Sequence, residues 1–476
     1  REGRAEYQRH RGVPGTPVEP VCAWFDEHGC THESCSDGTR FDAAHLAYAR
    51  KRASRLATQP PLRRGYLVPF TAPPSLDAIA ENLAKTVIKQ GLALHEAHHT
   101  HVPQSGKRAS FGLVRMANIE PLVAVAQALY RMEIPEGTQI HLCVYHSQFP
   151  LLLRSRLEAR LDRALDRRDE LSVFELPDIR ARLKGDAVDH LFIVLGSPVT
   201  EVGRDHDYDW AVVEPSSMRS IIQLVGRVRR HRPSAVTEPN IALLDTNVKH
   251  LEGRRPAFSH PGFETEQYWP LNTHNLSTLL REEEIDTIDS RPRLIPAESL
   301  SPTGKLVDLE HARLASLMVE GAEPLGAPKR RKRRGETPTV DLGAYLFYRP
   351  ATMTLSALAL QHAPFREDNA QESEFVLLPD EAEEDYLFCR VEKNGREEQL
   401  TLVERELDRL PDELLHNPRI TPWNEPDYMA ALSEQADAMG ISLERCANRF
   451  GRIRLKTDYA PYGWHFHPAL GFVRRK

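Results

Sequence analysis

Residues 191–232 read LFIVLGSPVTEVGRDHDYDWAVVEPSSMRSIIQLVGRVRRHR. This stretch contains two apolar runs, residues 191–195 and 210–213, bounded by glycine and proline. Short apolar runs of this kind are typical of buried parallel strands. The loop between them carries three residues suited to polar contacts or a close approach: Glu201, Gly203 and Asp205.

The end of the stretch is rich in arginine, with the spacing Gln223-x-x-Gly226-Arg227-x-x-Arg230. Pro215-Ser216-Ser217 opens a predicted helix, on which residues three apart share a face, so Arg227 and Arg230 should point the same way. Gly226 lets the backbone approach a ligand closely, and two guanidinium groups suit a polyphosphate. Taken alone, the motif also fits a solvated basic helix; the preceding loop favours the phosphate site.

Together, the loop and the arginine segment resemble motifs V and VI of superfamily 2 helicases. Residues 200–233 are similar to the type I-F CRISPR-associated helicase–nuclease family, and so is the ending GWHFHPALGFVRRK at residues 463–476. The close resemblance covers about residues 66–250. Two departures are Leu224, where many relatives have a third arginine, and Ser197-Pro198, where Thr-Gln is more usual.

Composition limits the possible classes of protein. The 476 residues suffice for two to four domains, and no apolar run is long enough for a membrane span. The net charge of -6 argues against a uniformly basic DNA-coating protein. Cys143, Cys389 and Cys446 lie in apolar or helical surroundings, as reduced buried thiols do, and a cytoplasmic, bacterial location is the simplest expectation. Because the chain starts at Arg1 rather than Met, it is expected to be part of a longer polypeptide.

Four segments are expected: a lead-in packed on the lobe (1–65), an α/β lobe (66–250), a connector with the basic run KRRKRR at 329–334 (251–345), and a small α+β C-terminal domain (346–476). Alternating strands and helices predict a parallel sheet flanked by helices, which the resemblance makes RecA-like. Predicted strands are 65–68, 111–116, 139–145, 190–196, 210–214 and 240–245. Predicted helices are 41–56, 75–90, 120–132, 152–167, 306–320 and 426–439. A hairpin at 386–402 turns at Asn394-Gly395, and strands near Ile453 and Phe472 end the chain.

Three motifs invite other functions. Cys22, His28, Cys30, His32 and Cys35 crowd together without a standard zinc spacing, so a metal site and a packed loop both stay open. His95-Glu96-Ala97-His98-His99 matches the HExxH pattern of zinc proteases; it is rejected because it ends a helix and no third ligand is evident. The acidic run from Asp380 follows the arginine motif, which is the wrong order for a Walker B box. No metal site is assigned to this chain.

Ligands of parallel sheets gather at the carboxyl ends of the strands, where several polar residues fall. The resemblance implies that Arg115 belongs to motif IV and binds DNA, although a structural ion pair is an equal alternative. It also implies DNA-backbone contacts from His146, Ser147, Arg154, Ser197, Thr200 and Glu201. For nucleotide, it implies arginine fingers at Arg227 and Arg230, coupling to lobe closure by Gln223, close approach at Gly226 and Gly203, and ribose or metal sensing by Asp205.

The chain contains no G-x-x-x-x-G-K-[ST] loop, so the resemblance implies half of a site for ATP with Mg²⁺, shared with a first lobe elsewhere. An HD nuclease with transition metals is also expected outside this chain, and the chain alone should be inactive. Implied partners are single-stranded DNA, the Csy crRNA-guided surveillance complex, and the nuclease and first lobe, with the spacer-acquisition complex and phage-encoded inhibitors as further candidates. Alternatives are another superfamily 2 translocase acting on DNA or RNA, or a nucleotide-dead scaffold.

Overall fold

The computed structural model describes residues 21–26, 29–201, 203–232, 234–266, 269–318, 371–394, 397–425, 427–459 and 462–475. The chain divides into two compact units, residues 1–59 with 290–297, and residues 60–289 with 298–476. Among the described residues no helix combines the length and apolarity needed to cross a membrane. The predicted basic run at 329–334 lies outside the described residues.

The smaller unit is a β-hairpin beside a long helix. It contains β1 (Val21–Asp26), β2 (Gly29–Ser34), α2 (Gly38–Thr58) and α11 (Arg291–Leu294). Asp37 caps α2 by accepting a hydrogen bond from the Arg40 N–H, and Trp24 stacks on Phe41 and Tyr48. Cys22, Cys30 and Cys35 are free thiols of this unit. Within the described residues, which omit His28, no group of three possible ligands could hold a metal ion.

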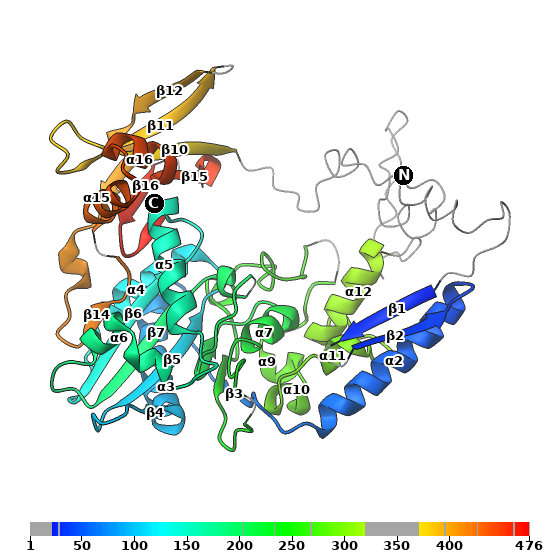
Figure 1. The fold of residues 1–476 in the computed structure, drawn as a ribbon. Helices are drawn as coiled ribbons and strands as arrows, with labels where there is room; N and C mark the ends of the chain where they lie inside the picture. Colours follow the sequence, from blue (N-terminus) through cyan, green and yellow to red (C-terminus); the bar gives the residue numbers. More distant parts are fainter. Residues whose placement is uncertain are drawn as a thin grey trace, which may run out of the picture. The chain divides into compact units, whose positions relative to one another are not determined.

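The larger unit is organised around one sheet, drawn in Figure 1, with the strand order β14-β6-β7-β5-β8-β9-β3. Each neighbouring pair along this order is parallel, and only the short β4 (Thr100–His101) runs antiparallel, beside β5. The parallel sheet flanked by helices that the sequence predicts is therefore confirmed. Its strands are β3 (Gly65–Val68), β5 (Arg108–Arg115), β6 (Thr138–Tyr145), β7 (Asp189–Gly196), β8 (Trp210–Val213), β9 (Ile241–Leu244) and β14 (Ile420–Pro422).

Alternate strand residues face opposite sides of the sheet and build two apolar cores. Ile193 belongs to a cluster with α3 and α4, and its neighbour Val194 to a second cluster with α6 and α7. This period of two is the expected consequence of a pleated strand buried on both faces. The helices nearest the sheet are α3 (Leu76–His98), α4 (Ile119–Tyr130), α5 (Leu151–Ala164), α6 (Pro177–Arg182) and α7 (Met218–Val225).

Helix α3 extends past its predicted end at residue 90. Ser75 caps it as expected, accepting from the Ala78 N–H, and Gly91 lies close to the Trp210 ring. The extension includes His95, whose ring is buried between Ser110 Oγ at 2.7 Å and Asp189 Oδ1 at 3.1 Å. His95 is thus a hydrogen-bonded core residue in this structure.

Described residues from 248–289 and 298–318 also pack on the lobe. Trp269, Leu276 and Leu309 are buried in the second cluster. The helices are α8 (Val248–Leu251), α9 (Leu276–Leu279), α10 (Glu282–Asp286) and α12 (Leu306–Met318). Cys143, Cys389 and Cys446 are buried and free, as predicted.

The described residues of the C-terminal region, within 371–475, form two small sheets and two α-helices. A four-stranded antiparallel sheet contains β10 (Glu372–Pro379), β11 (Tyr386–Asn394), β12 (Glu397–Leu402) and β15 (Arg452–Lys456). A three-stranded sheet contains β13 (Leu407–Arg409), β16 (Trp464–His467) and β17 (Gly471–Arg474). The helices are α15 (Tyr428–Met439) and α16 (Leu443–Phe450). The strands of the predicted hairpin, the predicted helix and both closing strands are confirmed; Gly395 lies outside the described residues.

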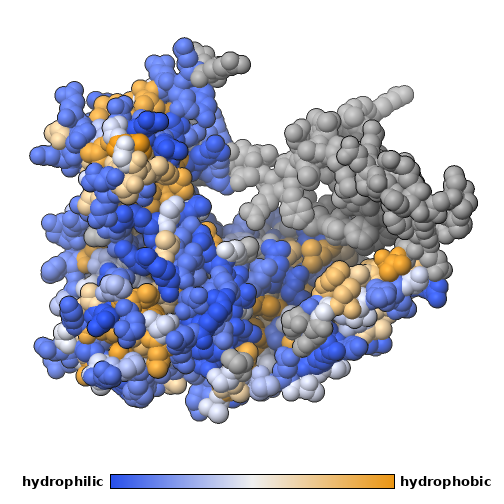
Figure 2. Space-filling view, in the orientation of Figure 1, coloured by the Kyte–Doolittle hydropathy of each residue, from blue (hydrophilic) through white to orange (hydrophobic). Residues whose placement is uncertain are grey.

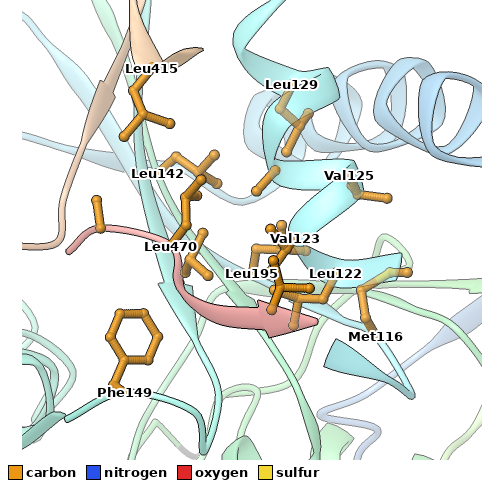
Figure 3. Packing of buried hydrophobic residues seen from close by; sticks show 14 of the residues in the cluster. Met116, Leu122, Val123, Val125, Leu129, Leu142, Phe149, Leu195, Leu415 and Leu470 are labelled. Carbon is orange, nitrogen blue, oxygen red and sulfur yellow. The ribbon is translucent and has the colours of Figure 1, made fainter. Parts of the chain in front are cut away.

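This region shares its core with the lobe. Leu415 and Leu470 pack with Leu142 of β6 and Leu129 of α4, as Figure 3 shows from close by, and β14 extends the lobe's own sheet. Around this shared core the visible surface is mainly hydrophilic, with scattered apolar side chains (Figure 2). The segment boundaries drawn from the sequence stay predictions.

Candidate functional site

The turn after β7 is the first component of the site. A Cβ at Gly196 would lie 2.3 Å from Thr200 Cγ2, so only glycine permits this close approach. Thr200 Oγ1 donates to the Ser197 carbonyl at 2.9 Å and closes the short 3₁₀ turn η2 (Pro198–Thr200). The turn therefore presents Ser197 at the strand end and delivers Glu201 to the interior.

Arg115 and Glu201 form a buried ion pair beneath this turn. Arg115 Nε donates to Glu201 Oε1 at 2.9 Å, and its two other nitrogens reach the Glu214 carbonyl and Ser216 Oγ, each at 2.8 Å. Ser220 Oγ donates to the second Glu201 oxygen at 2.9 Å. Arg115 is 1 % exposed and Glu201 6 %. The structural ion pair considered for Arg115 is what the structure contains.

The arginine segment departs from its predicted conformation. Ser217 caps α7, but the helix ends at Val225, before Arg227. The chain then pairs with Tyr208: the Tyr208 N–H donates to the Arg227 carbonyl and the Arg229 N–H to the Tyr208 carbonyl, both at 2.9 Å. The helix stops at Val225 because residues 227–229 pair with Tyr208 instead of continuing it. The prediction that Arg227 and Arg230 share a helical face is therefore wrong.

The same turn nevertheless brings both arginines to the loop after β7. Arg227 Nη2 donates to the Glu201 carbonyl at 3.0 Å, while its Nε is buried and has no hydrogen-bond partner within the described part of the chain. Burial and the nearby Arg230 lower the pKa of Arg227. Arg230 is exposed and forms an ion pair with Asp205; its hydrogen bond lowers the pKa of Asp205.

The other residues predicted to contact nucleotide surround this turn. Gln223 is exposed on α7, and Gly226 is the C-cap residue of that helix. Gly203 is exposed with φ of +79°, a conformation that favours glycine. Asp205 additionally contacts His231 Nε2 at 3.3 Å and pairs with Arg168.

A buried charge cluster supports the turn and was missed in the sequence. Arg232 Nε donates to Asp207 Oδ2 at 2.8 Å and its Nη1 to Asp209 Oδ1 at 2.6 Å. Arg167 Nη1 donates to the same oxygen of Asp209 at 2.7 Å. Arg167 and Arg232 hold the pKa of Asp209 at about 2 although burial favours the neutral acid. The alternating aspartates of DHDYD, residues 205–209, are the sequence pattern that could have predicted this cluster.

A cavity of about 650 Å³ opens at the carboxyl ends of β5, β6 and β7. Ser147, Ser197 and the first residues of α4 line it. Its five cationic side chains come from the segment after β9 and from the C-terminal region: Lys249, Arg254, Arg454, Lys456 and Arg474. Three carboxylates also line it, and one of them, Glu120, accepts from Arg474 Nε at 2.8 Å.

The structure separates the residues predicted to touch DNA. Ser147 and Ser197 line this cavity, although Ser197 is itself only 3 % exposed. Arg115, His146, Thr200 and Glu201 are buried and are not among the residues that line it. His146 Nε2 donates to the Leu470 carbonyl at 2.7 Å, and burial lowers the pKa of His146 to about 4. Arg154 lies on α5 and pairs with Glu158 at 3.3 Å. The three cationic residues of the C-terminal region were missed, although Arg474 stands in the quoted ending.

Known proteins resemble both parts of the larger unit. Residues 108–233 match the family described as CRISPR-associated nuclease/helicase Cas3, C-terminal. Residues 377–474 match CRISPR-associated Cas3 subtype I-F/YPEST-like, C-terminal domain.

Relatives extend the similarity over the whole chain. The CRISPR-associated nuclease/helicase Cas3 subtype I-F/YPEST of Pseudomonas aeruginosa (strain UCBPP-PA14) is 42% identical over 479 residues, covering 100% of this chain and 42% of the relative. The protein of the same name from Pectobacterium atrosepticum (strain SCRI 1043) is 36% identical over 476 residues, covering 99% and 41%. The chain thus spans about two fifths of the length of these relatives. A crystal structure of T. fusca Cas3 with AMPPNP is 16% identical, with a TM-score of 0.27 over 39% of this chain and 18% of that one.

Proposed function

The chain belongs to the type I-F Cas3 family and corresponds to the C-terminal part of its members, and we propose that it supplies the second motor lobe and C-terminal region of an ATP-dependent DNA helicase–nuclease. The relatives are named as nuclease/helicases of CRISPR systems. In this proposal the complete protein translocates along single-stranded DNA, and unwinds and degrades invader DNA after recruitment by a type I-F crRNA-guided surveillance complex. The proposal assigns the first lobe and the nuclease centre to the part of the relatives' length that this chain does not cover.

The observation that carries the proposal is the arrangement of Arg227 and Arg230. One irregular turn presents both, and the loop after β7 holds them through the Glu201 carbonyl and the Asp205 carboxylate. The buried Arg227 Nε is without a partner in the described residues, which leaves a donor for a phosphate oxygen. Arginine fingers in related nucleotide hydrolases contribute on the order of 10³–10⁵ in rate.

The surroundings of the two arginines suit a pocket completed by another lobe. Arg230 is exposed and paired with an exposed carboxylate, and such pairs are weak enough to exchange for a triphosphate. Gln223, Gly226 and Gly203 would border ATP with Mg²⁺, and Asp205 would release Arg230 or contact the ribose. When bound, ATP supplies the free energy for translocation; these residues bind and orient it.

The cavity at the strand ends is proposed to hold the DNA backbone. Ser147, Ser197, five cationic residues and three carboxylates line it. Hydroxyl and cationic groups are common phosphate contacts that carry no sequence information. The cations belong to the lobe and to the C-terminal region, so both would grip one strand. A groove of this kind suits sequence-independent single-strand binding.

Arg227→Ala in the full-length protein tests the proposal. ATP turnover at saturating single-stranded DNA should fall by about 10³ or more. Arg180→Ala is the matched control, because that exposed arginine of α6 pairs with the exposed Glu175, and it should keep wild-type turnover. Equal turnover in the two variants would leave only a nucleotide-independent scaffold. The 476-residue chain alone should hydrolyse no ATP above background.

A further inference from the structure

A series of buried hydrogen bonds runs from the rim of the cavity to Arg227. The Ala117 N–H, at the rim, donates to Glu214 Oε2 at 2.5 Å. The Glu214 carbonyl accepts from Arg115 Nη1 at 2.8 Å, and Arg115 Nε donates to Glu201 Oε1 at 2.9 Å. The Glu201 carbonyl then accepts from Arg227 Nη2 at 3.0 Å.

The centre of this series is the Arg115–Glu201 pair. Arg115 ends a central strand of the sheet, whereas Glu201 ends the turn whose earlier residues, Ser197 and Val199, line the cavity. The Glu201 carboxylate is held on both oxygens, by Arg115 and by Ser220 of α7. A side chain held on both oxygens fixes its own backbone, and the Glu201 carbonyl is the acceptor that orients Arg227.

We infer that Arg115 and Glu201 are positioning residues that set Arg227 according to occupancy of the cavity, an inference that rests on the proposed function. A phosphate bound beside Ser197 and Val199 displaces their turn, and Glu201 passes that displacement to Arg227. Both residues act without touching the nucleic acid, as their burial requires. Small displacements of a reacting group have large kinetic effects, so the consequence falls on turnover rather than on DNA affinity.

The test is Glu201→Gln in the full-length protein, assayed with ATP and oligo(dT). Glutamine keeps the volume and one acceptor but removes the charge that opposes Arg115. Turnover at saturating oligo(dT) should fall roughly tenfold to hundredfold, while the oligo(dT) concentration giving half-maximal turnover stays within about twofold. A raised half-maximal concentration with unchanged saturated turnover identifies Glu201 as a DNA contact and overturns the inference. Unchanged values of both quantities overturn it too.

Epistasis provides the decisive readout. If Glu201 acts through Arg227, Glu201→Gln combined with Arg227→Ala should turn over no more slowly than Arg227→Ala alone; multiplied losses overturn the inference. Ser220→Ala removes the second hydrogen bond on the Glu201 carboxylate and the longer one, at 3.3 Å, that the same hydroxyl accepts from Arg115 Nη2. It replaces Glu201→Gln in the same cycle should that variant fold poorly. Wild-type turnover in Arg227→Ala itself would instead overturn the proposed function, so the two failures are distinguishable.

Discussion

Asn424 binds both backbone groups of Val144, accepting from its N–H at 2.7 Å and donating to its carbonyl at 2.8 Å. The amide side chain thereby continues, beyond β14, the pairing that β14 makes with β6. The adjoining Trp423 is fully buried against Phe111 and Phe192. The C-terminal region is thus an integral part of the large parallel sheet.

Asn424→Ala should lower the free energy of unfolding by about 2–4 kcal/mol, because two buried backbone groups of Val144 lose their partner. Urea unfolding followed by tryptophan fluorescence measures the change. Asn448→Ala is the control: its amide donates to the carbonyl of Glu444 at the exposed start of its own helix, and the substitution should cost less than about 1 kcal/mol. Equal losses in the two variants would contradict the stated role.

Gly196→Ala should destabilise the turn after β7, by about 1–3 kcal/mol, because the new methyl overlaps Thr200 Cγ2. Thr200→Ser removes that methyl and keeps the hydroxyl that bonds Ser197. The double variant should therefore recover most of the stability lost in the single variant, as measured by thermal unfolding. Additive losses would show that the overlap is not the cause.

His146 should make folding stability depend on pH. Its Nδ1 accepts from the Gln148 N–H and its Nε2–H donates to Leu470, so the folded state requires the neutral ring, and the pKa of His146 is about 4. In the unfolded chain it is about 6.5. The unfolded state therefore takes up the proton first as pH falls, and the stability contribution present above pH 6.5 is lost toward pH 4.

The expected loss from His146 over that interval is about 3 kcal/mol. His146→Gln should flatten the dependence of unfolding free energy on pH between about 6.5 and 4. The exposed His416 supplies the control, since His416→Gln should leave the wild-type slope. A His146→Gln profile parallel to wild type would rule out this histidine as the source.

Neutralising the cavity should weaken the salt dependence of DNA binding. Arg254→Gln with Arg454→Gln removes two cations that line it. For single-stranded DNA each lost phosphate contact reduces the magnitude of the slope of log K against log salt by about 0.7. The magnitude of the slope of the double variant should therefore be smaller than that of the wild type by about 1.4. Arg163→Gln with Arg180→Gln, on exposed positions of α5 and α6, makes the same charge change and should keep the wild-type slope.

Much of the lobe was predictable because apolar runs bounded by glycine and proline are typical of strands buried on both faces. β14 was not, since Ile-Thr-Pro has no periodicity and becomes a strand only beside β6. The end of α7 was also missed: the arginines that follow favour a helix, but pairing with Tyr208 overrides that preference. Because ligands of parallel sheets gather at the carboxyl ends of strands, the sequence correctly singled out Ser147 and Ser197, which line the cavity. An arginine at position 115 can pair with a phosphate or with a buried carboxylate, so the sequence could not distinguish a DNA contact from a structural ion pair.

The strand β14 has a consequence for synthesis on the ribosome. Val144 and Asn424 are 280 residues apart, so β6 is translated long before its neighbour. Until then the edge of β6 lacks this partner, and exposed strand edges invite misassembly between nascent chains. Closing so long a loop is also slow. Completion of the parallel sheet is therefore a late event that waits for the C-terminal region to be synthesised.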